Sequence, residues 1–388
     1  MSKQTAAAST IQISQEQKTL MLSMELGETG WLLGFASAYG QKPLRRKIGS
    51  RDRRALMREI ERAKAVLGLE PGVRVVSCYE AGRDGFWLHR FLKSEGVESL
   101  VVDSSSIEVN RKKRRAKTDR VDLVALLDLL SRHLAGSAKP VWSVVRVPSV
   151  EDEDRRHLHR ELKLAKKDRT RVSHRMKGLL SNHGLTLDLR VDLAAQLAVM
   201  RQWDGSPLPP GLRGRLERYL GEYQYFTNRI HDLDSERRRI LREEKSPLLE
   251  KVLQLYSLRA LGINSSWMLT TEFFGWRDFR NGKQVGSMAG LTPTPFNSGG
   301  GEREQGIGKD GSRWVRGGAI ELAWGWLRFQ PQSALSQWYM RRFGSGSKRL
   351  RKIGIVALAR KLLIALWRFL ETGVVPDGAL LKTDLRLR

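Results

Sequence analysis

Short apolar runs and amphipathic helical patterns follow one another in the first third of the chain. The runs TLMLSMELG (19–27) and WLLGFAS (31–37) are partly alternating and are separated by Gly and Thr, which predicts paired strands. A third strand is expected around residues 44–48. Residues 51–67 then place Leu56, Ile60 and Ala63 on one helical face.

The pattern continues with strands and helices in alternation. VRVVSCYE (73–80) predicts a buried strand, GFWLHRFLKSEG (85–96) a helix and SLVVD (99–103) another strand, and a long helix is expected from about Thr118. Three strands followed by α, β, α, β and α is the element order of a ribonuclease-H-like fold. The fold class predicted for residues 1–135 is therefore α/β, a mixed sheet with helices.

The middle of the chain predicts two long helices. AGSAKPVWSVVRVPS (135–149) has two prolines and few charges, so a linker is expected over residues 136–150, followed by a helical domain over 151–250. Apolar residues there recur at heptad spacing on both sides of GSPLPPG, which is compatible with an antiparallel coiled coil that dimerises or with a plain hairpin packed on its own domain. The two stripes are Leu158, Leu162, Ala165, Val172, Met176 and Leu179, then Leu212, Leu216, Tyr219, Tyr223, Phe226, Ile230, Leu233 and Ile240.

The last part of the chain, residues 251–388, predicts a mainly helical domain with a glycine-rich loop region. Residues 286–313 carry many glycines, and a Trp-rich helix is expected from about Trp314. The longest apolar run, IGIVALARKLLIALWRFL, is interrupted by Arg360, Lys361 and Arg368. It therefore predicts a buried helix and not a membrane span.

The composition narrows the class of partner. The 388 residues include 69 Lys and Arg against 42 Asp and Glu, a formal net charge of +27, which makes nucleic acid the expected partner. Cys78 is the single cysteine, which excludes an internal disulfide and fits a reducing cytosol. The first residues contain no apolar stretch typical of a signal peptide. We expect a cytoplasmic, nucleoid-associated protein without a membrane partner.

Two acids stand at the start of the helix expected from Thr118. On a helix, Asp119 and Asp122 fall in the same stripe as Leu123 and Leu126, at the N-terminal end of the buried face. Burying two carboxylates is costly unless they are paired, protonated or bound to cations. The alternative is that they stabilise the helix dipole or that one of them is an N-cap.

Two further acids favour a metal site. Glu25 lies in the first predicted strand and Glu80 ends the fourth, and in a ribonuclease-H-like sheet these strands are neighbours at the centre. Together with Asp119 and Asp122 they form an oxygen-rich set suited to two Mg²⁺ ions, with Mn²⁺ as a substitute. Asp103, after the next strand, is a further candidate.

A basic run comes directly before the acidic helix. A nucleic-acid backbone held by this run would lie beside the metal ions. The alternative is a solvated loop. The residues concerned are Arg111, Lys112, Lys113, Arg114, Arg115 and Lys117.

With these residues in place the chain resembles the IS110 family of insertion-sequence transposases, which join an N-terminal RuvC-like DEDD domain to a C-terminal domain that carries a serine. The similar stretches are CYEAGRDGFWLHRFL, KTDRVDLVALL, AGLTPTPFNSGG and GIGKDGSRWVRGGAIELAW. Three places depart from the family pattern. The usual first Asp is Glu25, P-G-I-G is replaced by ALGIN (260–264), and S-K-x-G-N is replaced by GKDGS (308–312).

The resemblance implies a DNA transposase or site-specific recombinase. It implies that Glu25, Glu80, Asp119 and Asp122 bind Mg²⁺, and that Ser298 is the nucleophile of a covalent phosphoserine–DNA intermediate. Read alone, a serine before three glycines is typical of a turn. The resemblance also implies a homo-oligomer, a dimer or tetramer, and a structured non-coding guide RNA that pairs with target and donor DNA.

Three cations after the serine, Lys309, Arg313 and Arg316, are candidates for neutralising phosphate, with a solvated helix start as the alternative. Two other functions stay open. A Holliday-junction resolvase would use metal-activated water and would need the acids but not Ser298. A non-catalytic nucleic-acid-binding protein would keep its binding when Asp119 and Asp122 are replaced by Asn.

Overall fold

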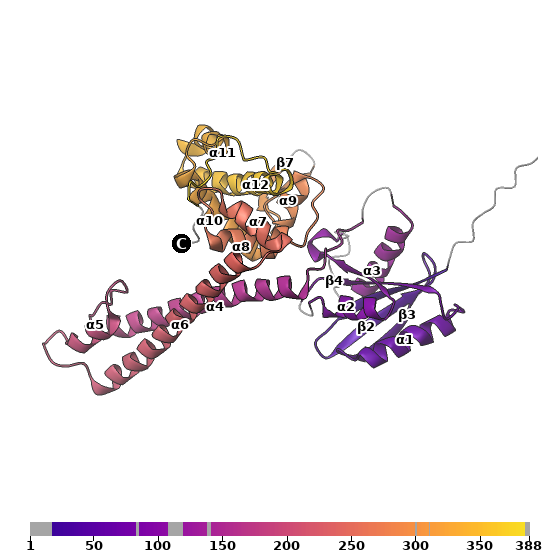
Figure 1. Cartoon of the computed structure of the whole chain (residues 1–388), viewed down its shortest axis with the longest axis horizontal. Coiled ribbons are helices and arrows are strands. Elements are labelled where there is room, and N and C mark those ends of the chain that lie inside the picture. The colour runs from indigo at the N-terminus through magenta and orange to yellow at the C-terminus, as the bar shows by residue number, and fades with distance from the viewer. Residues whose placement is uncertain are drawn as a thin grey trace, which may run out of the picture. The chain divides into compact units, whose positions relative to one another are not determined.

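The computed structural model describes residues 18–82, 85–107, 119–137, 141–298, 301–309 and 311–384. Side chains are described in these ranges except at Ser105 and at residues 119–121, 295–298 and 301–305. The chain divides into two compact units, residues 1–147 and 148–388 (Figure 1). The finer four-part division expected from the sequence stays a prediction.

A five-stranded mixed sheet forms the centre of the described part of the first unit. Its strand order is β3-β2-β1-β4-β5. The first three strands pair antiparallel, whereas β1 pairs parallel with β4 and β4 with β5. The strands predicted from the apolar runs are confirmed within one or two residues. They are β1 (Thr19–Leu26), β2 (Gly30–Ala36), β3 (Leu44–Gly49), β4 (Arg74–Glu80) and β5 (Glu98–Val102).

Helices α1 (Arg53–Val66) and α2 (Trp87–Ser94) pack on one face of the sheet. The side chain of Asp52 caps α1 by accepting a hydrogen bond from the Ala55 amide at 2.9 Å. Arg46 of β3 forms a salt bridge to Glu59 of α1 at 3.3 Å. On β2, the Trp31 ring contacts the Trp87 ring of α2.

Helix α3 (Asp119–Leu134) covers the opposite face, and a short 3-10 turn, η1 (Ser104–Ser106), follows β5. The Ser23 hydroxyl of β1 donates to the Leu123 carbonyl of α3 at 3.0 Å. Ser23 pairs with Gly34 of β2, whose missing side chain lets the helix approach closely.

Residues in the segment expected to be a linker, 136–150, add to the first unit. Val141 and Trp142 are buried with the α3 side chains. The Val145 amide donates to the Val101 carbonyl at 2.7 Å, so the chain runs along β5 before it leaves the unit.

Two long helices of the second unit, α4 (Val150–Ser181) and α6 (Pro210–Glu243), run side by side, with the short α5 (Leu193–Val199) between them in sequence (Figure 1). Ser149 caps α4, and three acids occupy its first turn. The predicted heptad stripes are largely buried where the two helices meet. These buried residues are Leu162, Ala165, Val172, Met176, Leu212, Leu216, Ile230 and Leu233, whereas Ile240 is buried with Leu249 and Trp267 of the helices that follow.

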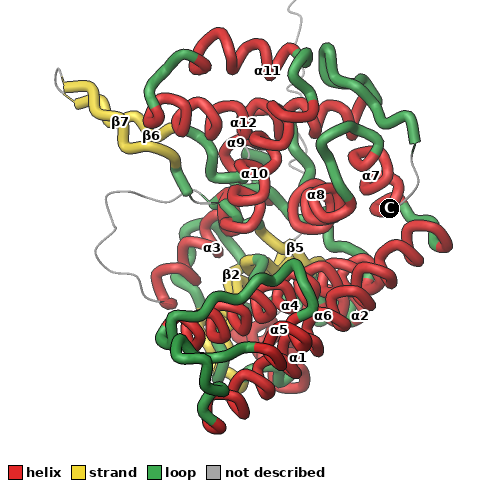
Figure 2. The backbone as a smooth tube through the Cα atoms, turned by 90° about the vertical axis from the view of Figure 1, so that its left-hand side faces the viewer, coloured by secondary structure: helices red, strands yellow, loops and turns green. Residues whose placement is uncertain are grey.

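The rest of the second unit packs around α12, the predicted buried helix (Figure 2). No helix in the described residues is long and apolar enough to cross a membrane. The α12 residues Leu358, Leu362 and Leu366 are fully covered. The elements are α7 (Pro247–Tyr256), α8 (Ile263–Leu269), the π-helix η3 (Thr270–Phe274), α9 (Gly282–Met288), β6 (Pro293–Ser298), β7 (Gly301–Ile307), α10 (Arg313–Phe329), α11 (Ala334–Tyr339), η4 (Met340–Gly344) and α12 (Lys348–Thr372).

Candidate functional site

Glu25 and Glu80 stand at the carboxyl ends of two neighbouring central strands. The register pairs Met24 of β1 with Tyr79 of β4, so each glutamate is the next residue on its strand. Neighbouring strands are about 4.8 Å apart. The expected adjacency of these two strands is thus confirmed, and both acids lie at the same end of the sheet.

Both acids also belong to the face of the sheet that α3 covers. Side chains alternate along a strand, so Glu25 shares a face with Ser23, and Glu80 with Cys78. The Ser23 hydroxyl contacts α3 as described above, and the Cys78 thiol lies 3.8 Å from the Leu126 carbonyl of the same helix. Burial raises the pKa of Cys78, and the charge of Glu80 raises it further. That charge effect agrees with a Glu80 carboxylate on the α3 side.

The direction of α3 brings its first turn toward these acids. The last turns of α3, with Leu129 and Leu130, share a core cluster with Met21 of β1. Its earlier residue Leu123 contacts Ser23, which is further along β1. The helix therefore runs roughly antiparallel to β1, and its start lies toward the end of the strand that carries Glu25.

The two acids of α3 are described to different extents. Asp119 is the first residue of the helix, and its side chain lies outside the described residues. Asp122 is half-buried one turn later. Asp103 follows β5 and is 3% exposed. Its backbone amide donates to the Ser143 carbonyl at 3.0 Å, and its carbonyl accepts from the Ser106 amide.

The donor set fits Mg²⁺ by its chemistry, because carboxylate oxygens are the ligands that this ion takes. Among the side chains that the structure describes, no three His, Cys, Asp or Glu residues lie close enough to hold a metal ion. The Asp119 side chain is not among them. The metal site with four acids stays a prediction, as does the role of the basic run 111–117, which lies outside the described residues.

Ser298 is the last residue of β6, in the hairpin of β6 and β7. The hairpin pairs antiparallel, with Ser298 opposite Gly301. Figure 2 shows it projecting from the helices of the second unit. The Ser298 side chain lies outside the described residues, so its role as nucleophile is untested. The serine and the four acids belong to different units.

Two of the three cations after the serine are exposed, and the third holds the loop together. Lys309 and Arg313 are exposed, and Lys309 has a φ of 62°. The Arg316 guanidinium donates to the Lys309 carbonyl at 3.1 Å and to the Gly311 carbonyl at 3.2 Å. A side chain at Gly311 would lie 1.9 Å from the Met288 carbonyl oxygen, so only glycine fits there. Arg316 thus stabilises the loop that carries Lys309.

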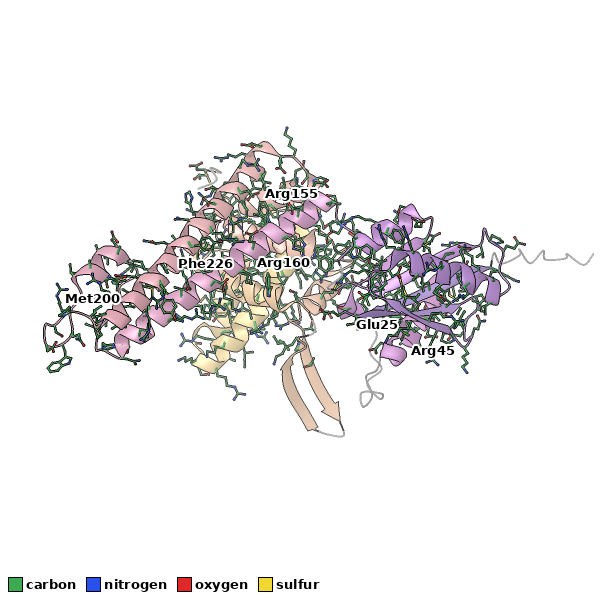
Figure 3. All side chains as sticks on the ribbon, turned by 90° about the horizontal axis from the view of Figure 1, so that it is seen from below. Glu25, Arg45, Arg155, Arg160, Met200 and Phe226 are labelled. Carbon is green, nitrogen blue, oxygen red and sulfur yellow. The ribbon has the colours of Figure 1, made fainter. Side chains whose placement is uncertain are left out.

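Sequence reasoning missed a buried ion cluster around Glu272 of η3. Arg160 of α4, labelled in Figure 3, donates to its carboxylate at 2.6 and 2.9 Å. Arg156 donates to the same carboxylate at 3.0 Å, and Glu272 itself is 4% exposed. Burial raises the pKa of Glu272, and the two guanidiniums outweigh it and lower the pKa overall. The available signal was a single acid within the apolar run MLTTEFFGW.

A second buried cluster surrounds Arg237 of α6, which is 1% exposed. Its guanidinium donates to Asp234 and, at 2.7 Å, to Asn264, and it lies 3.3 Å from Nδ1 of His159. Burial lowers the pKa of His159 to about 4, and the Arg237 charge adds to the effect. This cluster ties α4 and α6 to the ALGIN turn.

The family model and the known proteins to which this chain is similar are all described as transposases. The family model for IS116/IS110/IS902 transposases matches residues 253–339. The chain is 36% identical over 382 residues to y4rJ of Sinorhizobium fredii, named as a candidate transposase, covering 94% of this chain and 95% of that protein. It is 28% identical over 303 residues to y4qE of the same organism, also named as a candidate transposase, covering 76% of this chain and 69% of that protein. It is 24% identical over 262 residues to the transposase for insertion sequence element IS1328 of Yersinia enterocolitica, covering 67% of this chain and 73% of that protein.

Proposed function

The chain belongs to the IS116/IS110/IS902 family of transposases, and we propose that it is the recombinase that cuts and rejoins the DNA of an insertion sequence. One observation carries the proposed chemistry. Glu25 and Glu80 end neighbouring parallel strands on the face covered by α3, whose first turn carries Asp119 and Asp122. A protein that only binds nucleic acid gains nothing from acids at the ends of these strands and at the start of the helix that covers them.

The first unit is proposed to be a ribonuclease-H-like, RuvC-like domain. Support comes from the strand order β3-β2-β1-β4-β5, with an antiparallel meander followed by two parallel crossovers. The pair α4 and α6 is proposed to form an antiparallel coiled coil, and the buried heptad stripes support it.

Glu25, Glu80, Asp119 and Asp122 are proposed to hold two Mg²⁺ ions, which Mn²⁺ can replace. When bound, such ions stabilise the negative charge on the attacking and leaving oxygens of a phosphodiester. Glu25 has one more methylene than the Asp usual in the family, so its carboxylate reaches further from β1. A buried Cys78 on the same face keeps this side of β4 apolar beneath the acids.

Ser298 is proposed as the nucleophile. Its hydroxyl oxygen forms a bond to phosphorus while the bond from phosphorus to one nucleoside oxygen breaks. The serine gives its proton to the solvent, and the departing oxygen takes a proton from the solvent and leaves as a hydroxyl. The product is a phosphoserine ester, so attack by the hydroxyl of another strand reverses the step and restores a phosphodiester. Lys309 and Arg313 are proposed to neutralise the phosphate charge, with Arg316 fixing their loop.

The proposed partners are DNA at the element ends and target, a structured non-coding RNA from the element, and further copies of the chain as a dimer or tetramer. The net charge of +27 supports simultaneous contact with RNA and two duplexes, because each bound phosphate needs a nearby cation. Oligomerisation is proposed to bring Ser298 against the acids. We propose that the protein acts in the cytoplasm, on nucleoid DNA.

The test uses purified protein, Mg²⁺, RNA from cells carrying the element, and labelled DNA that spans the element ends. Reactions are stopped with detergent and run on a denaturing gel. A DNA–protein adduct is expected with the wild type, and with Ser298→Ala the adduct should be absent. Equal cutting by both proteins without an adduct would instead indicate a resolvase that uses water.

Asp122→Asn is the companion variant, because it removes one charge at nearly constant shape. It should abolish cutting while DNA binding remains. If the wild type itself binds every element-end DNA but cuts none of them in Mg²⁺, the protein is a binding protein and not a recombinase.

A further inference from the structure

The edge strand β3 carries cations on the same face of the sheet as the acids. The register places Lys47 opposite Leu32 of β2, and Leu32 opposite Glu25 of β1. Residues directly opposite each other in antiparallel strands point to the same face. Lys47, Leu32 and Glu25 therefore form one row across the sheet, and Arg45 lies in the next row toward the middle of β1, opposite Gly34.

The Lys47 side chain is directed along this face toward the end of the sheet where Glu25 lies. Its Cε is 3.2 Å from the point where a Cβ on Gly30 would stand. Gly30 begins β2, two residues before Leu32, at the end of the sheet where β1 finishes. Figure 3 labels Glu25 and Arg45 on this sheet. A Cβ at position 30 would crowd this path, and the Lys47 side chain would have to shift to make room for it.

The charges of β3 are used differently on its two faces. Arg46 points to the other face, where it pairs with Glu59 of α1. Arg45 and Lys47 are exposed, and neither forms a salt bridge with any residue that the structure describes. Two exposed cations in one face of an edge strand are suited to binding a phosphate backbone.

We propose that Lys47 and Arg45 bind the backbone of the DNA strand that is cut, beside the acids at the end of β1. Two strand spacings of about 4.8 Å separate β3 from β1, roughly 10 Å in all. At about 3.4 Å per nucleotide, this corresponds to two or three nucleotides from the phosphate at the acids. The inference rests on the proposed function, since it needs DNA to reach that end of the sheet.

The experiment measures the binding of the full-length protein to labelled element-end DNA at several salt concentrations, without Mg²⁺ so that no cutting occurs. Each phosphate contact contributes about 0.9 to the slope of log K against log salt for duplex DNA, and about 0.7 for a single strand. Lys47→Ala should lower the magnitude of the slope by about that amount, and Lys47→Ala with Arg45→Ala by about twice as much. Lys47→Arg keeps the charge and should keep the slope.

Arg58→Ala is the matched control. Arg58 is an exposed cation of α1, which covers the opposite face, so its replacement removes the same charge at the wrong place. An unchanged slope for Lys47→Ala, or an equal change for Arg58→Ala, would overturn the proposal. Cations on edge strands also prevent sheet-to-sheet association. If that were their function, the variants would aggregate in sedimentation while their monomeric fraction bound DNA with the wild-type slope.

The cutting assay separates this inference from the proposed function. With Mg²⁺, Lys47→Ala is expected to cut at a reduced rate at subsaturating DNA, while Asp122→Asn does not cut. If Asp122→Asn cuts at the wild-type rate, the proposed metal chemistry is refuted, and the salt slopes alone test whether Lys47 contacts the DNA backbone. If Asp122→Asn is inactive but Lys47→Ala binds with the wild-type salt slope, only the proposed role of Lys47 is refuted.

Discussion

Gly34 of β2 controls how closely α3 approaches the strands that carry the acids. A Cβ at this position would lie 2.9 Å from the Ser23 hydroxyl oxygen and 3.0 Å from Cδ2 of Leu123. Both distances are shorter than ordinary contacts between such atoms. Gly34→Ala therefore forces α3 away from the sheet at the turn that follows Asp122.

The expected loss of stability follows from two opposing terms. Adding a methyl group to a well-packed core costs about 1–3 kcal/mol. Replacing glycine by alanine lowers the entropy of the unfolded chain, which offsets about 0.4–1 kcal/mol. The net destabilisation of the β1–β2–α3 packing is about 1–2 kcal/mol. Gly72→Ala is the control, because no atom lies within 4 Å of its Cβ position and its φ is ordinary.

Hydrogen exchange read by mass spectrometry reports this change locally in the full-length protein. Since 1.4 kcal/mol is a factor of ten in an equilibrium, amides of α3 and β1 that exchange by local opening should exchange about five to thirty times faster in Gly34→Ala. Peptides of the second unit should not change. Gly72→Ala should match the wild type or exchange more slowly.

A double variant isolates the clash. Ser23→Ala alone removes a buried hydrogen bond and costs about 0.5–1.5 kcal/mol. In Gly34→Ala with Ser23→Ala, the closest of the contacts is gone, so the combined loss should be smaller than the sum of the two single losses. Wild-type exchange in Gly34→Ala, or additive losses in the double variant, would refute the close packing of α3 on this strand pair.

Other predictions concern single side chains of both units. Cys78 should resist alkylation at pH 8 in the folded protein, because the thiol is buried and its pKa is raised, and should react once urea unfolds β4; rapid labelling without urea would contradict its burial. Glu272→Gln should destabilise the second unit by about 3–5 kcal/mol in urea titrations, because Arg156 and Arg160 lose their buried counter-charge. The pKa of His159 in the folded protein is about 4, below its ordinary value. The stability present above about pH 6.5 should therefore fall by up to about 3 kcal/mol as the pH drops to 4. In His159→Gln, the melting temperature should depend less on pH across that range. Glu25→Asp should keep Mg²⁺-dependent cutting if the residue is a metal ligand, and a loss as complete as in Glu25→Ala would mean that the longer side chain is required.

The local elements of this protein could be predicted because their causes are local. Apolar alternation over 19–27 and 31–37 and the helical face of Leu56, Ile60 and Ala63 arise from the periods of strand and helix, which the sequence displays directly. The interrupted apolar run of α12 likewise pointed to a buried helix. The sequence also placed Glu25 and Glu80 at the ends of neighbouring strands, which the strand register confirms. The metal site that these acids would form with Asp119 and Asp122 stays a prediction, made because acids at strand ends and in a buried helical stripe are costly without a cation.

Other features depend on contacts between residues far apart in the chain, which no local period encodes. The segment 136–150 has the composition of a linker, yet Val145 pairs with β5 because an edge strand offers unpaired backbone groups. Glu272 meets arginines more than a hundred residues away, so its pairing shows only in three dimensions. The three cations of β3, residues 45–47, are consecutive in the sequence. The register alone separated Arg46, which pairs with α1, from Lys47, which faces the side of the acids, because a shift of one residue moves a side chain to the opposite face of a sheet.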